Sequence, residues 1–475
     1  MTFHSLDFVI FFLVVVTLYW RLGHRHQNLL LLVASYFFYG YVHPWFLWLI
    51  FATTVVDYGA ARGMAARPDR RRLFMGLSLA ANLGMLGFFK YFDFFADNVH
   101  VVLAPIGLDV PRPALSIVLP VGISFYTFQE LSYTIEVYRG TLTARRHFLD
   151  FATFVCFFPQ LVAGPIERAS RLLPQVEGER RFSWAAARDA TVLILWGYFQ
   201  KLVIADNVGV VANKVFALRD PSFPVLWAGV FAFGIQIYAD FSAYSDIARG
   251  TARWFGFEIM RNFRHPYLAR GPADFWHRWH ISLSSWFRDY VYIPLGGSRG
   301  SPPRRAFNVL ATFVLSGFWH GASWNYVLWG FFHGLLLVGA RALTPFAPRG
   351  RIRAALAAPL QVVVMFGFVN VGWLMFRETD TASLLRDFTL SPFRATPLEL
   401  QTGLYLFLFA VLYSLPLWMH AAWEHTGPER AGAVAPGVST SPRRMALEAV
   451  LCGVLFAIIL VFRSRTSLDF IYFQF

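Results

Sequence analysis

Long apolar segments recur along the whole chain and restrict it to folds that a lipid bilayer allows. They include residues 8–19, 73–89, 191–196, 226–238, 307–318, 356–376 and 404–418. The chain is 56% hydrophobic and 15% charged, which is more apolar surface than a water-soluble domain can carry. A helix needs about 20 apolar residues to cross a bilayer, so some segments need their flanks as well. The pattern predicts an all-α, multi-pass membrane protein with about ten to twelve transmembrane helices.

Arginine supplies nearly all of the positive charge, and the formal net charge is +14. The arginines cluster between apolar segments, as the positive-inside rule predicts for cytoplasmic loops, and no soluble basic domain is apparent. We therefore expect the lipid bilayer as a partner and no nucleic acid. Arg21, Arg25 and the basic cluster at residues 62–72 alternate with poorly charged turns, which predicts that the N-terminus lies on the non-cytoplasmic side.

The apolar stretch at residues 148–165 departs from this alternation, because basic patches flank it on both sides. A single straight crossing cannot begin and end on the same face of a membrane. Pro159, Gly164 and Pro165 interrupt the stretch. We therefore expect a re-entrant or in-plane element beside a central funnel or tunnel.

We expect one integral membrane domain over residues 1–475. Residues 1–147 and 346–475 are predicted to be mostly spans, whereas residues 148–345 hold the densest polar groups in apolar surroundings. Ionisable groups inside a membrane are costly and mark functional sites, so residues 148–345 are the expected catalytic core. Residues 427–444 are rich in Pro, Gly, Ser and Arg and predict a flexible loop.

His320 is the first candidate for chemistry, because it closes an apolar helix expected to begin near Phe307. Counted from Asn308 at about 1.5 Å per residue, it lies past the middle of the membrane core. An imidazole there can take a proton from a hydroxyl group near neutral pH. The alternative is a packed histidine that is hydrogen-bonded to a neighbouring helix. Its neighbours Trp319 and Asn325 are candidate substrate-binding residues.

A second polar and aromatic cluster covers residues 274–290 and is too polar for a span. His277 and His280 are three residues apart, so one continuous helix would put them on one face. Arg278 and Arg288 offer guanidinium groups to an anionic donor group such as phosphate. The alternative is an amphipathic helix in the membrane interface, anchored by tryptophans. The candidate substrate-binding residues of this cluster are Trp276, Arg278, Trp279, Trp286, Arg288 and Asp289.

A third polar cluster contains Asp240 and Tyr244, whose spacing of four residues places them on one stripe of a helix. A substrate-binding role and a structural network are equally good interpretations of this stripe.

No metal site is expected, because the histidines show no H-E-x-x-H spacing and both cysteines lie in apolar runs. The histidines considered are His265, His277, His280, His320 and His333. No phosphate-binding loop and no G-x-S-x-G motif occurs, which argues against an ATP-driven pump and a serine hydrolase.

Taken in order, these motifs resemble the membrane-bound O-acyltransferase family. Within it they resemble the bacterial branch of the alginate O-acetylation membrane protein and the D-alanyl transfer protein of teichoic acid. The resemblance covers residues 121–140, 159–175, 238–250, 262–297, 318–334 and the C-terminal Phe470, Tyr472, Phe473, Gln474 and Phe475. It implies a ring of helices around a funnel, with His320 as catalytic base and His280 as second active-site histidine. His277 and Ala243 stand where similar sequences usually carry arginine and glycine, so the resemblance implies the reaction class but does not identify the substrate.

The resemblance also implies a reaction. We expect an O-acyltransferase of the bacterial inner membrane that moves an acetyl group from a cytoplasmic thioester, acetyl-CoA, to hydroxyl groups of an exported polysaccharide. A periplasmic partner of SGNH-hydrolase-like fold is implied, and no permanently bound cofactor is expected. One alternative is a D-alanyl or other acyl transferase that uses a carrier-protein thioester. Another, from a different class, is a non-catalytic transporter or scaffold of an export complex.

Overall fold

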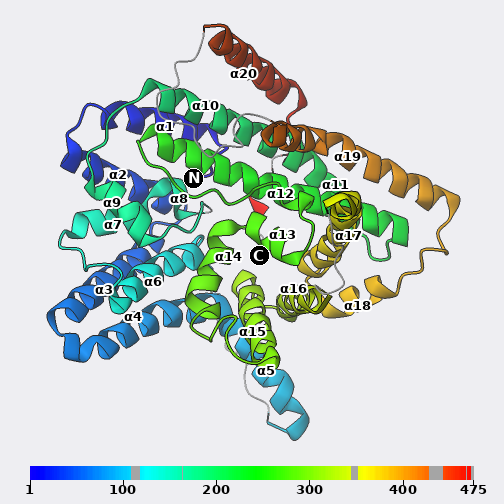
Figure 1. Ribbon diagram of the computed structural model, residues 1–475, viewed down its shortest axis with the longest axis horizontal. Helices are drawn as coiled ribbons and strands as arrows, with labels where there is room; N and C mark the ends of the chain where they lie inside the picture. The colour runs from blue at the N-terminus through cyan, green and yellow to red at the C-terminus, as the bar shows by residue number, and fades with distance from the viewer. Residues whose placement is uncertain (109–117, 163, 344–350, 427–441, 467, 472–475) are drawn as a thin grey trace. The chain divides into compact units, whose positions relative to one another are not determined.

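The structure is a computed structural model that describes residues 1–475 except for residues 109–117, 163, 344–350, 427–441, 467 and 472–475. The described part consists of α-helices joined by turns and by short 3-10 or π-helical segments, and no strand occurs within it (Figure 1). The all-α prediction is therefore confirmed.

Several helices are suited to a membrane by length and composition. Within the described residues, five helical stretches are long and apolar enough to cross: Pro68–Ile106, Phe223–Trp254, Trp324–Leu343, Leu356–Arg377 and Pro397–Glu424. Leu6–Tyr19 and Ala449–Phe462 are shorter apolar helices. The chain is thus a multi-pass membrane protein, as predicted. The number of ten to twelve crossings stays a prediction, because the other helices are shorter or more polar.

The residues group into two compact units, one of residues 1–187 and 251–260 and one of residues 188–250 and 261–475. The prediction of a single functional domain, with internal boundaries at residues 148 and 346, stays a prediction.

The first unit is a set of helices held together by buried polar contacts. α3, α4 and α6 pack against one another, and α2 packs against α7 (Figure 1). Asp57 of α3 accepts hydrogen bonds from Ser78 at 2.5 Å and from Asn82 at 2.8 Å, both on α4. Such hydrogen bonds provide partners for polar side chains, because lipid tails cannot form hydrogen bonds with them. The helices are α1 (Leu6–Tyr19), α2 (His24–Gly40), α3 (Phe46–Ala66), α4 (Arg71–Leu86), α5 (Phe92–Leu103), α6 (Ile123–Arg139), α7 (Phe148–Cys156), α8 (Phe158–Leu161) and α9 (Ala169–Glu177).

The stretch that was predicted to re-enter the membrane is broken into α7, of nine residues, and α8, of four. Phe157 lies between them with a ψ of 102°, so the helix cannot continue through it. At about 1.5 Å per residue, neither helix reaches the roughly 30 Å of a bilayer core. Residues 151–161 are all buried. Burial is expected, because a broken helix at membrane depth must have its backbone polar groups shielded from lipid by the protein. The predicted interruption of a straight crossing is confirmed.

The second unit holds most of the candidate site residues. Its helices are α10 (Trp184–Phe199), α11 (Asp206–Phe216), α12 (Phe223–Trp254), α13 (Pro272–Arg278), α14 (Ile281–Phe287), α15 (Pro302–His320), α16 (Trp324–Leu343), α17 (Arg351–Arg377), α18 (Thr381–Thr389), α19 (Pro397–Thr426) and α20 (Pro442–Phe462). The first residues of α10 and the last residues of α12 belong to the first unit. Most of the predicted flexible loop at 427–444 lies outside the described residues, and its last three residues already belong to α20.

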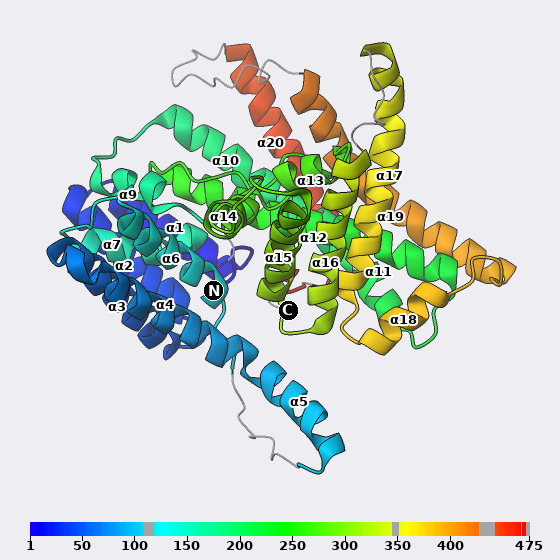
Figure 2. The same ribbon diagram turned by 60° about the horizontal axis from the view of Figure 1, so that its bottom comes forward.

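α15 and α16 lie side by side, with α17 next to α16 (Figure 2). Two glycines permit the close approach of α15 and α16. A Cβ atom on Gly317 would lie 2.1 Å from the carbonyl oxygen of Tyr326, and one on Gly330 would lie 2.2 Å from that of Phe313. Only residues without a side chain allow helices to approach so closely. This contact fixes the end of α15, where His320 lies.

Candidate active site

His320 is the last residue of α15 and is 5% exposed. The helix begins at Pro302, five residues before the predicted start at Phe307. Aromatic rings enclose the imidazole, with ring centroids 5.0 Å away for Trp319, 5.1 Å for Trp329 and 5.3 Å for Phe376. Such a wall of aromatic rings excludes bulk water from the imidazole.

His280 lies at a break between two short helices. α13 ends at Arg278, Trp279 is extended, and His280 has a φ of 41°, in the left-handed region that few non-glycine residues adopt. His280 is fully buried, whereas His277 is exposed and its Nδ1 lies 2.6 Å from the carbonyl oxygen of Ala273. The prediction that the two histidines share a helical face is wrong, because the helix is interrupted between them. For the same reason, residues 274–290 do not form one amphipathic helix.

The structure brings the two candidate histidines to one indole ring. The centroid of Trp319 lies 5.0 Å from that of His320 and 6.1 Å from that of His280. His280 also contacts Phe241 of α12, at 4.7 Å between ring centroids. Segments far apart in the sequence, namely α12, the break between α13 and α14, and the end of α15, therefore build one aromatic cluster that contains both imidazoles.

The burial of His280 predicts acid sensitivity. Burial lowers the pKa of His280 to about 3, against about 6.5 in an unfolded chain. Between these values the unfolded chain binds the additional proton, so stability is lost as the pH falls below about 6.5. From pH 6.5 to pH 5 this loss is about 2 kcal/mol. In detergent, we expect the thermal unfolding temperature of the wild-type protein to fall as the medium is made acidic, and that of His280→Gln to fall by less. If the unfolding temperatures of wild type and His280→Gln changed equally with pH, buried His280 would not be a source of acid sensitivity.

The two arginines predicted to bind an anion already have carboxylate partners. Nε of Arg278 lies 2.6 Å from Asp274, and Nε of Arg288 lies 2.8 Å from Asp289. The Arg288 side chain is 59% exposed, and exposed ion pairs are weak. An anionic ligand can therefore displace the partner of Arg288 more readily than that of Arg278, which is less exposed.

Asp240 and Tyr244 lie on one stripe of α12, as predicted, and both contact other parts of the protein. Asp240 lies 3.0 Å from Nζ of Lys201 and accepts a hydrogen bond from the backbone N–H of Ile471 at 2.8 Å. The ring of Tyr244 stacks on Phe470 at 3.9 Å between centroids. These contacts favour the structural interpretation of the stripe, which joins α12 to the C-terminal segment.

The side-chain amide of Asn325 is similarly engaged. It donates to the backbone oxygen of Glu378 at 2.5 Å and accepts from the hydroxyl of Thr381 at 2.8 Å. These bonds fix the turn after α17, so they favour a structural role for Asn325 over contact with a substrate.

The predicted tryptophans are all buried but do not form one group. Trp276 faces His333, at 5.1 Å between ring centroids, and Trp279 stacks beside Tyr267 at 6.2 Å. Trp286 packs against its own helical neighbours. Trp276 and Trp279 thus belong to the aromatic core around the two short helices.

A buried charge cluster in the second unit was missed by the sequence analysis. Nζ of Lys201 lies 2.9 Å from Asp206 and 3.0 Å from Asp240, and it donates to the backbone oxygen of Leu468 at 2.9 Å. The sequence feature that could have indicated this cluster is Lys201 itself, one of three lysines in the chain, which directly follows an apolar run.

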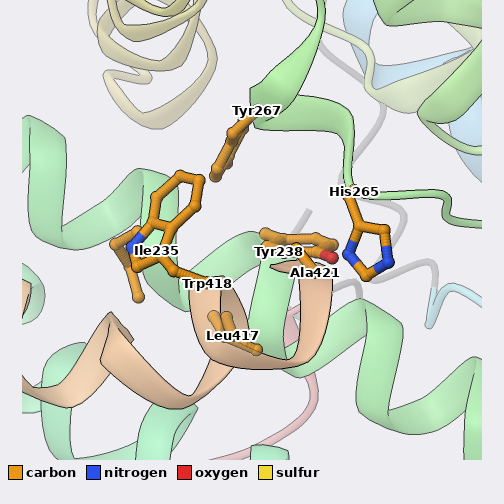
Figure 3. Close-up of a pocket in the computed structure, with 7 residues that line it drawn as sticks. All are labelled: Ile235, Tyr238, His265, Tyr267, Leu417, Trp418 and Ala421. Atoms are coloured by element: carbon orange, nitrogen blue, oxygen red, sulfur yellow. The ribbon is translucent and has the colours of Figure 1, made fainter. Parts of the chain in front are cut away.

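A second missed cluster combines His265, His420 and Glu424. Within the described part of the chain, these residues form the one group of His, Cys, Asp or Glu close enough to hold a metal ion. His265 also lines a pocket with Tyr238, Tyr267 and Trp418 (Figure 3). The available sequence signal was the spacing of four residues between His420 and Glu424, which places them on one face of a helix.

Comparison with known proteins decides the family. The profile of the membrane-bound O-acyltransferase family matches residues 142–377, which include His280 and His320. The chain is 36% identical to "Probable alginate O-acetylase AlgI" of Azotobacter vinelandii over 506 aligned positions that cover all of both proteins. The chain belongs to the membrane-bound O-acyltransferase family. The predicted resemblance and the predicted enzyme class are confirmed, and the transporter and scaffold alternatives are set aside.

Other relatives of this O-acyltransferase carry different names. It is 34% identical to the "Peptidoglycan O-acetyltransferase" of Helicobacter pylori, with 76% of this chain and 72% of the relative covered. It is 31% identical to the "Teichoic acid D-alanyltransferase" of Streptococcus thermophilus, with 46% of this chain and 55% of the relative covered. The roles of the individual site residues stay predictions.

Proposed function

We propose that this O-acyltransferase moves an acetyl group from cytoplasmic acetyl-CoA to hydroxyl groups of an exported polysaccharide, either directly or through a periplasmic protein of SGNH-hydrolase-like fold. The full-length similarity to a protein named for alginate O-acetylation carries the proposal. Two relatives named for D-alanyl transfer, 31% and 28% identical, align with only 46% and 56% of the chain. We place the enzyme in the bacterial inner membrane, with its N-terminus in the periplasm.

In the proposed reaction, His320 is the general base. The acceptor hydroxyl attacks the carbonyl carbon of the thioester and gives its proton to the His320 imidazole. A C–O bond forms, the C–S bond breaks, and the proton passes from the imidazole to the departing thiolate, which leaves as free CoA. The aromatic rings around His320 support this role, because they limit the water that could hydrolyse the thioester.

The developing oxyanion needs a hydrogen-bond donor, and we assign Trp329 to this role. Its ring lies 5.1 Å from that of His320 between centroids. Its indole N–H is buried and makes no hydrogen bond within the described part of the chain. A donor without a partner in a dry site is available to stabilise charge that develops in the transition state. His280 faces the same cluster through Trp319 and is proposed to orient the donor.

Two labelled donors distinguish the proposal from its nearest alternative. Purified enzyme in proteoliposomes is supplied with acetyl-CoA or with a D-alanyl carrier-protein thioester, together with an alginate, cellulose or peptidoglycan acceptor. We expect transfer from acetyl-CoA and none above background from the D-alanyl donor, measured as label in the acceptor. Transfer from the D-alanyl donor alone would replace the proposal by the carrier-protein alternative. The same reaction, run with and without the periplasmic partner protein, tests whether the enzyme transfers the acetyl group directly.

A further inference from the structure

His265, His420 and Glu424 converge although two of them lie far from the third in the sequence. His265 precedes the 3-10 turn Pro266–Leu268, and the other two lie one turn apart on α19. Nε2 of His265 is 2.6 Å from Oε2 of Glu424, and Nε2 of His420 is 3.9 Å from Oε1 of the same carboxylate. One ligand atom from each residue lies within 4.8 Å of the others.

These residue types match the chemistry of a zinc-like ion. Zn²⁺ is bound by two imidazoles and one carboxylate in a common three-ligand arrangement, at about 2.0–2.2 Å from each ligand atom. Tetrahedral geometry at that distance separates ligand atoms by about 3.4 Å. The separations of 2.6 and 3.9 Å involve different oxygens of Glu424, and one ligand atom from each residue lies within 4.8 Å of the others. Formation of the site therefore requires side-chain rotations that bring one ligand atom of each residue to the tetrahedral spacing.

The surroundings of the cluster suit a bound cation. A cavity beside it is lined by both imidazoles and by the polar residues Gln200, Ser242, Asp246 and Arg261. This cavity leaves room for a fourth ligand such as water, which a three-ligand zinc site requires. The Asp246 carboxylate contributes negative charge on the same side.

Arg261 is the main feature that disfavours metal binding, because it is a cation paired with the proposed ligand Glu424. Its Nη2 donates to both oxygens of Glu424, at 3.1 and 2.9 Å, and Arg249 pairs with Asp246 at 3.0 Å. Without a metal ion these charges already balance, so the alternative is a network in which Arg261 forms an ion pair with Glu424 and His265 is hydrogen-bonded to the same carboxylate. With a metal ion, one oxygen of Glu424 coordinates it and the other keeps its bond to Arg261, as outer-shell donors do in metal sites.

We propose that His265, His420 and Glu424 bind one divalent transition-metal ion of the zinc class. The ion ties the segment before Tyr267 to α19. The ring of Tyr267 lies 6.2 Å from that of Trp279, the residue before His280 (Figure 3 shows Tyr267 and His265 at the pocket). The metal site thus has a positioning role, because it restrains the segment that supports His280. Binding of the ion does not depend on which acyl group the enzyme transfers.

The test uses the full-length enzyme in detergent, stripped of metal by a chelator and titrated with Co²⁺ and then Zn²⁺. We expect one equivalent of Co²⁺ to bind with the visible absorption of a tetrahedral site, and Zn²⁺ to displace it. His420→Ala and Glu424→Gln should weaken binding at least about 100-fold, more than loss of an outer-shell partner does. His277→Ala is the matched control, because this exposed histidine lies in the same unit but outside the cluster, and it should bind as the wild type does.

A variant that replaces one metal ligand by another distinguishes loss of metal binding from loss of the fold. His420→Cys supplies a thiolate, so it should still bind one Co²⁺ and add the strong near-ultraviolet absorption of a sulfur-to-cobalt transition. Wild-type protein that binds no stoichiometric Co²⁺ or Zn²⁺ overturns the proposal in favour of the ion-pair network. Binding that persists in both His420→Ala and Glu424→Gln overturns it as well, because the ion would then lie elsewhere.

Discussion

Replacement of His320 by alanine is expected to lower acetyl transfer from acetyl-CoA by about 10²–10⁴-fold, the usual contribution of a general base. The imidazole lies in an aromatic enclosure, where water cannot take over proton removal efficiently. The measurement is the initial rate of label transfer to the polysaccharide in proteoliposomes.

Protein quality must be matched before these rates are compared. His320→Ala should express, insert into the membrane and elute from size exclusion as the wild type does. His277→Ala, at an exposed histidine of the same unit, serves as the control and should retain near wild-type transfer. A well-folded His320→Ala enzyme with wild-type activity would eliminate His320 as the base.

Lys201→Met is expected to give the largest loss of stability, about 3–5 kcal/mol, because it leaves buried carboxylates without their cation. The Lys201 side chain is 1% exposed and contacts Asp206 and Asp240, whose side chains are each 2% exposed. Its Nζ also donates a hydrogen bond to the backbone oxygen of Leu468. We therefore expect a much lower thermal unfolding temperature in detergent and release of the C-terminal segment to limited proteolysis.

A matched control for this change is Lys214→Met, since Lys214 is exposed on the neighbouring helix α11. It should unfold at nearly the wild-type temperature. Replacement of all three members of the cluster by apolar residues of similar size should recover part of the stability, as it does for other buried ion clusters. Equal stability of Lys201→Met and Lys214→Met would show that the buried cluster contributes little.

The fold class followed from the sequence because lipid imposes a strong local rule. A spanning segment must be apolar along its length, so α12, α17 and α19 are visible as apolar runs. The interruption at α7 and α8 was also predictable, since basic residues on both flanks forbid a single crossing. The start of α15 was placed five residues late, because the polar residues of its first turn hide the boundary.

The candidate site was predictable only in part. His320 was marked by its place at the end of an apolar helix, and His280 by its resemblance to a family position. The break at His280 was not predictable from helical spacing, because a left-handed φ at a histidine has no local sequence signal. The partners of Asp240 and Asn325 were also hidden, so both were grouped with substrate-binding residues although other parts of the protein occupy their side chains.

Contacts across long stretches of sequence account for most of what was missed. Lys201 and Leu468 are 267 residues apart, and His265 and Glu424 are 159 residues apart. Such pairs arise only when the helices have packed, and no local period or spacing encodes them. The sequence therefore indicated which residues are costly to bury but not which of them neutralise one another.

We propose that His320 acts as a base on a donor and an acceptor that enter from opposite faces of the membrane. The most direct test seals labelled acetyl-CoA inside vesicles that carry the enzyme in one orientation, with its cytoplasmic face inward and the polysaccharide acceptor and any periplasmic partner outside. We expect labelled polysaccharide outside intact vesicles with the wild-type enzyme and none above background with His320→Ala. Label transfer that requires donor and acceptor on the same face, or that persists with His320→Ala, would contradict it.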